Sequence, residues 1–356
     1  MAEWAVPVFS REQYNHAARI IMDVKNVPTM QVEHALQMVN NWRASHNYPL
    51  NTFQVTLRRK ARAIDADVLV AQRIKRLTSI LYKLQRFPEM KLTQMQDIGG
   101  CRAIVKNVRL VDELVRSYER SDLKHGRATK DDYIRTPQPS GYRGVHLVYR
   151  YFSDKNKTEY NELKIEMQFR SQLQHAWATA VETVGTFIGQ ALKASKGQEE
   201  WLRFFALMGS TLAMREKQPL VPNTPSDKDE LKSELRQHAQ KLNVVQVLQG
   251  FGIAMQTVAR PSAEMQDAHF YLVALNANEK TVTIEGFRQN EADAASKRYL
   301  EVERDLLGKE GNDAVLVSVD SLAALEQAYP NYFLDTNRFI GALREALDDT
   351  QGKKAA

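Results

Sequence analysis

The spacing of apolar residues along the chain predicts both helices and strands. Recurrence at steps of three and four residues predicts helices over 11–45, 53–69, 69–87, 108–121, 172–194, 201–214, 226–249, 290–307, 322–328 and 336–347. Pro28 opens a second helix within the first range, and Asn47–Pro49 breaks the pattern. Apolar alternation predicts strands near 101–106, 145–151, 162–169, 269–275, 280–287 and 313–319. The order of these elements predicts an α+β fold, with a mixed sheet flanked by helices.

The strand near 162–169 carries polar side chains at every second position. A period of two places them on one face of a sheet. They are Lys164, Glu166, Gln168 and Arg170. A face that combines an acid, an amide and a guanidinium indicates a binding site, although a solvated sheet face produces the same alternation.

A second acid precedes the strand near 101–106. Asp97 lies in a short loop, and Gly99 and Gly100 after it allow close backbone approach. Asp97 and Glu166 are therefore expected at the ends of neighbouring strands. Two such carboxylates suit Mg²⁺, which prefers oxygen ligands and completes its shell with phosphates. Spacing alone leaves this interpretation open.

Two basic segments are candidates for phosphate contact. In the predicted helix over 69–87, Lys75, Ser79 and Lys83 recur every four residues and share one helix face, which suits a triphosphate. The preceding helix carries a cluster that contacts RNA phosphates or is simply solvated. Its members are Arg58, Arg59, Lys60 and Arg62. A basic helix taken alone is usually only solvated.

Composition predicts a soluble cytoplasmic protein. Hydrophobic residues make up 43% of the 356 residues, enough for a well-formed core. The single cysteine, Cys101, excludes an internal disulfide and a Cys-rich zinc site. We find no apolar run of membrane-spanning length and no signal peptide, so we expect no membrane contact.

Charge is unevenly distributed along the chain, whose net charge is +6. Residues 11–90 hold 13 Lys and Arg against 6 Asp and Glu, whereas residues 262–356 hold 10 against 17. The two segments can attract each other, and the basic one suits a polyanion such as a nucleotide or tRNA. Solvated charge explains the same asymmetry.

Six segments, spread over about residues 60–190, together resemble the synthetase domain of the RelA/SpoT family, and they occur in the family's order. They are Arg73–Lys75 with Ser79 and Lys83, Asp97–Arg102, Asp132–Ile134, Gly141–His146, Glu166–Arg170, and Gln174–Ala178 with Glu182. The resemblance implies a nucleotidyltransferase-like fold that transfers pyrophosphate from ATP to a nucleotide 3′-hydroxyl.

The resemblance also implies a role for each site residue. Asp97 and Glu166 would hold Mg²⁺, and Glu166 would also act as general base. Tyr142 would stack on the acceptor base. The ATP-binding residues implied are Arg73, Lys75, Ser79, Lys83 and Arg102, and those completing the acceptor pocket are His146, Gln168 and Arg170. His175 is expected to have a structural role.

The C-terminal part resembles a small zinc-finger-like domain. Residues 262–356 contain no cysteine and one histidine, His269, so this domain is expected to be metal-free. Tyr329 and Tyr332 form a YxxY motif ahead of the last predicted helix. The combination resembles the CapRel group of fused toxin–antitoxin synthetases, and implies that the tyrosines block the ATP site until a phage capsid protein releases them. Ordinary packing also explains both tyrosines.

The expected organisation has five parts. They are N-terminal helices (1–60), a synthetase domain (61–195), a helical connector (196–260), the antitoxin-like domain (261–335), and an anchoring helix with a tail (336–356). The first part contains no paired His-Asp hydrolase motif, so a lone synthetase is expected.

Three hypotheses of function follow. The first is an autoinhibited toxin that modifies the 3′ CCA end of tRNA. The second is a (p)ppGpp synthetase that uses GDP or GTP and is regulated by its C-terminal domain. The third is an RNA-binding protein with a decayed synthetase fold, against which the intact Asp97, Tyr142 and Glu166 argue.

Overall fold

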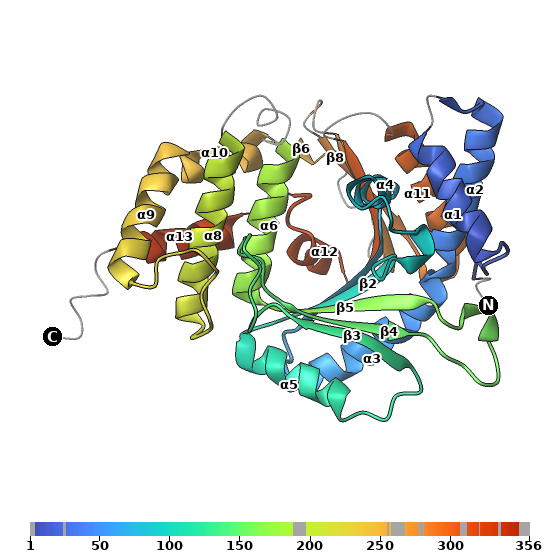
Figure 1. Ribbon diagram of the computed structural model, residues 1–356, viewed down its shortest axis with the longest axis horizontal. Coiled ribbons are helices and arrows are strands. Elements are labelled where there is room, and N and C mark those ends of the chain that lie inside the picture. Colours follow the sequence, from blue (N-terminus) through green and yellow to red (C-terminus); the bar gives the residue numbers. More distant parts are fainter. Residues whose placement is uncertain are drawn as a thin grey trace.

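One mixed sheet runs through the molecule, and helices cover both of its faces (Figure 1). The computed structural model describes residues 4–23, 26–187, 197–254, 256–257, 268–276, 279, 281–306, 312–319, 321–333 and 336–348. In these ranges nine strands lie in the order β3-β4-β5-β2-β1-β9-β7-β8-β6. The α+β class expected from the apolar pattern is therefore confirmed.

The first five strands form one half of the sheet. They are β1 (Leu69–Ile74), β2 (Gly99–Val105), β3 (Gly126–Asp132), β4 (Val145–Arg150) and β5 (Lys164–Ser171). β2 and β5 run parallel, and the other neighbours in this half are antiparallel. The register pairs Gln168 with Arg102 on one side and with His146 on the other. Paired residues point to the same face, so these three side chains are neighbours.

One face of the sheet carries the main apolar core. The helices on this side are α1 (Arg11–Met22), α2 (Thr29–Ser45), α3 (Asn47–Arg62), α5 (Val108–Glu119) and α11 (Ala292–Leu306). Figure 1 shows α3 and α5 below the strands. Ile165, Met167 and Phe169 are fully buried in this core. The polar residues that alternate with them must therefore point to the opposite face.

The opposite face of the sheet is covered by a second group of helices. They are α6 (Gln172–Phe187), α8 (Gly197–Arg215), α9 (Lys228–Lys241), α10 (Val244–Ala254), α12 (Leu322–Ala328) and α13 (Asn337–Leu347). α6 packs on β2 and β5, and α12 packs on β1. The other four helices form a separate apolar core with α6. This arrangement leaves the polar face of β5 next to α6 and α12 (Figure 1).

The C-terminal strands extend the same sheet. They are β6 (Gln256–Thr257), β7 (Phe270–Asn276), β8 (Thr281–Phe287) and β9 (Asp313–Ser318). β9 joins β1 through the pairs Gln72–Ser318 and Arg73–Val317. The hairpin and third strand predicted here are confirmed, but they continue the sheet, and no zinc-finger-like unit stands apart from it in the described residues. The boundaries proposed for the five parts stay predictions.

The predicted helix over 69–87 is wrong in its first half. That half is β1, which pairs with β2 and β9, and pairing on both sides outweighs the local helical pattern. Helix α4 covers Leu77–Arg86. Lys75 therefore lies in the turn before α4 and does not share a helix face with Ser79 and Lys83.

Smaller differences concern helix ends. Asn47 begins α3, and Pro49 lies in its first turn, where a missing N–H costs nothing. Asp227 is the N-cap of α9, because its carboxylate accepts hydrogen bonds from the backbone amides of Asp229 and Glu230. A residue with a left-handed backbone, Asn243 (φ 47°), separates α9 from α10.

Some predictions lie outside the described residues. They are the end of the helix over 172–194, the domain boundary near residue 261 and the tail over 351–356. Among the described residues, no helix is both long and apolar enough to cross a membrane.

Candidate active site

The polar face of the first half-sheet brings most of the predicted site residues together. Gly100 pairs with Glu166 in register, and Arg102 pairs with Gln168. Gln168 Nε2 donates to Glu166 Oε2 at 2.6 Å, and Arg102 Nε donates to Gln168 Oε1 at 3.3 Å. The alternation noticed in the sequence thus becomes a continuous hydrogen-bonded row across β2 and β5.

Asp97 is held between two lysines at the entrance to β2. Lys75 Nζ lies 2.6 Å from Asp97 Oδ2, and Lys83 Nζ lies 3.0 Å from Oδ1. Burial alone would raise the pKa of Asp97, but the two ammonium groups lower it below its ordinary value. Asp97 is therefore an ionised carboxylate at neutral pH, and Lys83 joins it to α4.

Glu166 pairs with a histidine. His146 Nδ1 lies 3.0 Å from Glu166 Oε1. Burial opposes the charged imidazole, but the hydrogen bond with Glu166 and the contact with Tyr142 raise the pKa of His146 to about 9. Burial raises the pKa of Glu166, and His146 lowers it below its ordinary value. The neighbouring charge of Asp97 acts on Glu166 in the opposite sense, which places the two carboxylates in one electrostatic site.

Tyr142 closes the other end of this row. Its hydroxyl lies 2.6 Å from His146 Nε2 and accepts from Arg170 Nη2 at 2.8 Å. The Arg170 guanidinium carbon lies 5.0 Å from the centre of the Tyr142 ring. Burial raises the pKa of Tyr142, but Arg170 and His146 lower it below its ordinary value. Gly141 has φ +94°, and a Cβ there would lie 2.7 Å from a backbone oxygen, so the turn that presents Tyr142 requires glycine.

Three of the five residues predicted to bind ATP line one open pocket of about 500 Å³ at α4. Its lining is Lys75, Thr78, Ser79, Tyr82, Lys83, Arg86 and Phe87. Lys75 reaches this pocket from the turn before the helix, so the three residues predicted from their spacing do meet. The helix face proposed for all three is wrong, because α4 begins at Leu77, and their role in binding phosphate stays a prediction.

Arg73 and Arg102 lie against the C-terminal part of the chain. The Arg102 guanidinium carbon is 5.9 Å from the centre of the Tyr329 ring. Burial and, to a smaller extent, the charge of the nearby Arg170 lower the pKa of Arg102 to about 10. Glu182 on α6 partly balances these charges: burial raises its pKa, but Arg73 and Arg102 lower it below its ordinary value.

Tyr332 is buried beside a second ion pair. Its hydroxyl donates to Asp313 Oδ2 at 3.0 Å and accepts from Arg76 Nη1 at 3.3 Å. Arg76 and Asp313 also contact each other directly. Burial raises the pKa of Tyr332 to about 12. Each tyrosine of the YxxY motif therefore contacts an arginine of the first half-sheet or of the turn before α4. Arg76 and Asp313 were not singled out in the sequence.

The basic cluster on α3 is not part of this site. Arg58, Arg59, Lys60 and Arg62 lie on the helix that covers the opposite face of the sheet. Lys60 Nζ donates to the Ser117 carbonyl at 3.0 Å and lies 5.2 Å from the centre of the Tyr118 ring. Lys60 is thus a packing residue between α3 and α5.

His175 has the structural contact expected of it. Its Nε2 lies 3.1 Å from the Gln327 carbonyl oxygen, so it links α6 to the end of α12. Burial and the nearby Arg102 lower its pKa well below the ordinary value. His175 is accordingly neutral at physiological pH.

The two carboxylates fit a magnesium ion that keeps most of its ligands from water and phosphate. Asp97 and Glu166 supply oxygen donors, which Mg²⁺ prefers, and their side chains are 19% and 15% exposed. The described residues hold no group of three or more metal-binding side chains. Cations, namely two lysines and a protonated histidine, now balance both acids, so a metal would replace charge that the protein already supplies.

Comparisons with known proteins match the part of the chain that contains this site. Residues 72–184 match the family described as a region found in RelA/SpoT proteins. The GTP pyrophosphokinases YjbM and YwaC of Bacillus subtilis are 34% identical over 115 residues and 33% identical over 117 residues. These alignments cover 31% and 30% of this chain and 52% of each relative, so the chain spans about half the length of the curated relatives it matches.

A solved structure is also similar in part. It is that of small alarmone synthetase 1 from Bacillus subtilis bound to its product pppGpp, at 21% identity and a TM-score of 0.40, covering 48% of this chain and 91% of that one. The family match supports the RelA/SpoT resemblance for residues 72–184. It does not separate the CapRel group from other alarmone synthetases.

Proposed function

We propose that this protein is an ATP-dependent pyrophosphotransferase whose acceptor is the 3′-hydroxyl of a purine nucleotide. One observation carries the proposal: two ionised carboxylates, Asp97 and Glu166, lie in a single site between the phosphate pocket at α4 and Tyr142. The match of residues 72–184 to the RelA/SpoT region supports it.

The chemistry that we propose is the one that the RelA/SpoT resemblance implies. The acceptor oxygen attacks the β-phosphorus of ATP, the bond from that phosphorus to the oxygen of the α-phosphate breaks, and AMP leaves. Glu166 takes the proton of the acceptor hydroxyl. Lys75, Ser79 and Lys83 bind the phosphates, and Tyr142 stacks on the acceptor base. When bound, Mg²⁺ supplies charge neutralisation for the phosphates. Alignment and charge neutralisation account for most of the catalysis.

The acceptor that we propose first is the 3′ CCA end of tRNA, whose last base is adenine. The support is the resemblance of the YxxY motif and the metal-free C-terminal part to the CapRel group. The basic cluster on α3 gives no support, because it lies across the sheet from Tyr142. The second candidate is GDP or GTP, as in the GTP pyrophosphokinases named above, because stacking on Tyr142 tolerates either purine.

We also propose that Tyr329 and Tyr332 hold the enzyme inactive. Tyr329 is 3% exposed and lies against Arg102, and Tyr332 is 1% exposed and lies against Arg76. The Tyr329 ring on the Arg102 guanidinium and the Tyr332 hydroxyl on Arg76 would compete with a nucleotide for the same partners. A phage capsid protein that binds the C-terminal part would release them and so stop translation during infection.

One experiment tests the reaction and the acceptor together. Purified protein, and its Tyr329→Ala/Tyr332→Ala variant, are incubated with ATP labelled in the β-phosphate and with either deacylated tRNA or a GDP and GTP mixture. We expect label in tRNA, and more of it with the variant. Label in the guanine nucleotides alone identifies a (p)ppGpp synthetase, and label in neither acceptor contradicts the proposed reaction.

A further inference from the structure

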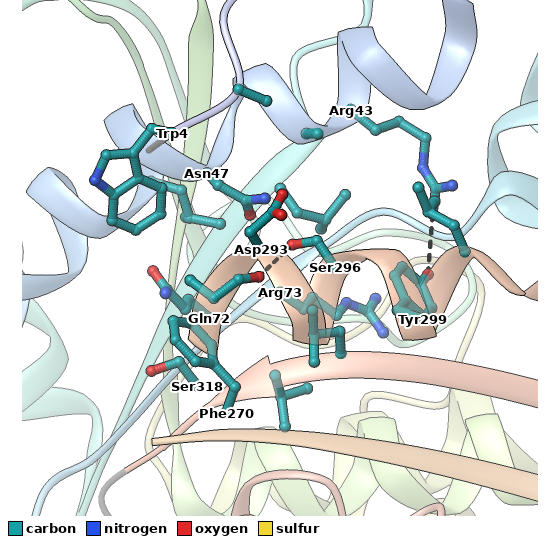
Figure 2. Close-up of a pocket in the computed structure, with 18 of the residues that line it drawn as sticks. Trp4, Arg43, Asn47, Gln72, Arg73, Phe270, Asp293, Ser296, Tyr299 and Ser318 are labelled. Atoms are coloured by element: carbon teal, nitrogen blue, oxygen red, sulfur yellow. Dashed lines mark hydrogen bonds between the residues drawn. The ribbon is translucent and has the colours of Figure 1, made fainter. Parts of the chain in front are cut away.

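A buried ion pair joins the C-terminal helix α11 to the N-terminal helix α2. Arg43 Nη1 lies 2.6 Å from Glu303 Oε2, and Arg43 Nη2 lies 3.0 Å from Oε1. Tyr299 adds two bonds, accepting from Arg43 at 2.9 Å and donating to Glu303 at 3.0 Å. The side chains of Arg43 and Glu303 are 2% and 6% exposed. Figure 2 shows Arg43 and Tyr299 joined at one end of the cavity between α11, β1 and the N-terminal helices.

Both partners of this pair also bind the backbone just before and at the start of α4. Glu303 Oε1 accepts a hydrogen bond of 2.7 Å from the backbone amide of Leu77, the first residue of the helix. Arg43 Nε donates to the carbonyl oxygen of Lys75 at 3.0 Å. The turn from β1 to α4 is therefore held by one acid and one base that come from distant parts of the chain.

The N-terminus of α4 has no cap of its own. Arg76 occupies the N-cap position and makes no side-chain cap hydrogen bond. A capping side chain normally satisfies an amide of the first turn, and an acid there also interacts favourably with the helix dipole. Glu303 meets both needs across 226 residues of sequence. It thus takes the place that a local Ser, Thr or Asp usually fills.

We infer that Glu303, fixed by Arg43, is a positioning residue for the ATP phosphates. The pair sets the turn that places the Lys75 side chain on Asp97 and starts the helix carrying Ser79 and Lys83. The C-terminal part therefore helps to shape the phosphate pocket. This inference rests on the proposed function, because the ligand of the pocket is taken to be ATP.

Stability alone does not explain the pair. Replacing a buried ion pair by apolar side chains of similar size is often neutral or stabilising, whereas removing one partner is strongly destabilising. The double variant Arg43→Met/Glu303→Leu therefore keeps the core filled and leaves no uncompensated charge. It removes the cap from Leu77 and the anchor from Lys75 while the fold is retained.

The test compares this double variant with its parent by hydrogen exchange of the full chain. Peptides covering 75–86 report the amides of the first turn of α4. We expect those amides to exchange about tenfold faster, the range that loss of a cap predicts, with peptides of β2 and β5 unchanged. Glu301→Gln, on the exposed side of α11, is the matched control and should change nothing.

Kinetics give the second readout. In the Tyr329→Ala/Tyr332→Ala background, the Arg43→Met/Glu303→Leu change should raise KM for ATP about tenfold and alter kcat less than about twofold. Unchanged exchange at α4 in a folded double variant overturns the inference, as does an unchanged KM in an active one. If the Tyr329→Ala/Tyr332→Ala variant transfers label to neither acceptor, the proposed function is wrong. Hydrogen exchange at α4 then tests the positioning role by itself.

Discussion

The two halves of the sheet differ in how they are joined and in what they carry. Within the first half, β2 and β5 pair over seven residues, from Gly99–Ile165 to Val105–Ser171. Between the halves, β1 and β9 pair at Gln72 and Arg73. The junction is instead held by side chains, because Glu303 and Asp313 from the C-terminal half meet residues 75–77.

The same face of the sheet is charged in one half and apolar in the other. The first half presents Arg102, Glu166 and Arg170, whereas Tyr271, Val273 and Val317 of the second half form an apolar cluster with both tyrosines of the YxxY motif. Under the proposed function, this difference assigns the chemistry to the first half and its control to the second. Four predictions test this division.

The largest effect is expected from the carboxylates of the first half. Asp97→Asn or Glu166→Gln should lower pyrophosphate transfer by a factor on the order of 10³ while the fold is kept, because each removes a charge at the reacting phosphates. Transfer is measured with labelled ATP, and folding by thermal unfolding. Glu162→Gln, at an exposed acid near β5, is the control. Undiminished transfer by either variant removes that residue from the catalytic site.

The next largest effect is expected from the tyrosines of the second half. Tyr329→Ala/Tyr332→Ala should raise transfer by roughly 10², because a tethered contact acts at an effective concentration of about millimolar. Expression of this variant should halt growth without phage, and adding Glu166→Gln should restore it. Tyr332→Phe, which keeps the ring, should stay inactive. A folded, expressed and harmless double variant refutes autoinhibition.

A pH effect on stability should come from His146 in the first half. The pKa of His146 is raised to about 9 in the folded protein from an ordinary value of 6.5, so its stabilising contribution is complete below pH 6.5 and is lost as the pH rises through 9. The shift corresponds to on the order of 3 kcal/mol. Unfolding is measured in denaturant between pH 6 and 10. His146→Gln should flatten this dependence, and an equally steep curve in the variant contradicts the assignment.

The smallest effect is expected from the basic cluster on α3. Arg59 lies across the sheet from Tyr142, so Arg59→Glu should lower tRNA modification less than about threefold. It should change the slope of log affinity against log salt concentration by about one. Modification of tRNA is measured between 50 and 200 mM salt. A much larger loss would show that tRNA reaches around the sheet, and no change in slope would show that Arg59 makes no phosphate contact.

Local pattern predicted the first half better than the junction. The alternation over 164–170 placed Glu166, Gln168 and Arg170 on one face, because strand geometry alone decides this. β3 was missed: Gly126–Asp132 has no apolar alternation, and this edge strand pairs with β4 alone among the described strands. Its polar sequence suits an exposed edge.

The contacts between residues far apart in the sequence could not be predicted from the local pattern. Glu303 is one of several acids on a charged helix, and nothing near it in the sequence indicates that it is buried. Its partner Arg43 lies 260 residues away, and the amide it caps belongs to the segment 69–87, whose first half was wrongly predicted as helix. The pairing of His146 with Glu166 likewise depends on the register of β4 against β5.

The position of β9 in the chain has a consequence for synthesis on the ribosome. β1 ends at residue 74, and the strand that covers its free edge begins at residue 313. At about 5 to 20 residues per second, that strand emerges roughly 10 to 50 s after β1. During this interval the first half-sheet can fold with the edge of β1 unpaired and with Arg102 not yet covered by Tyr329. A newly made molecule can therefore bring its carboxylates together before its tyrosines have been synthesised.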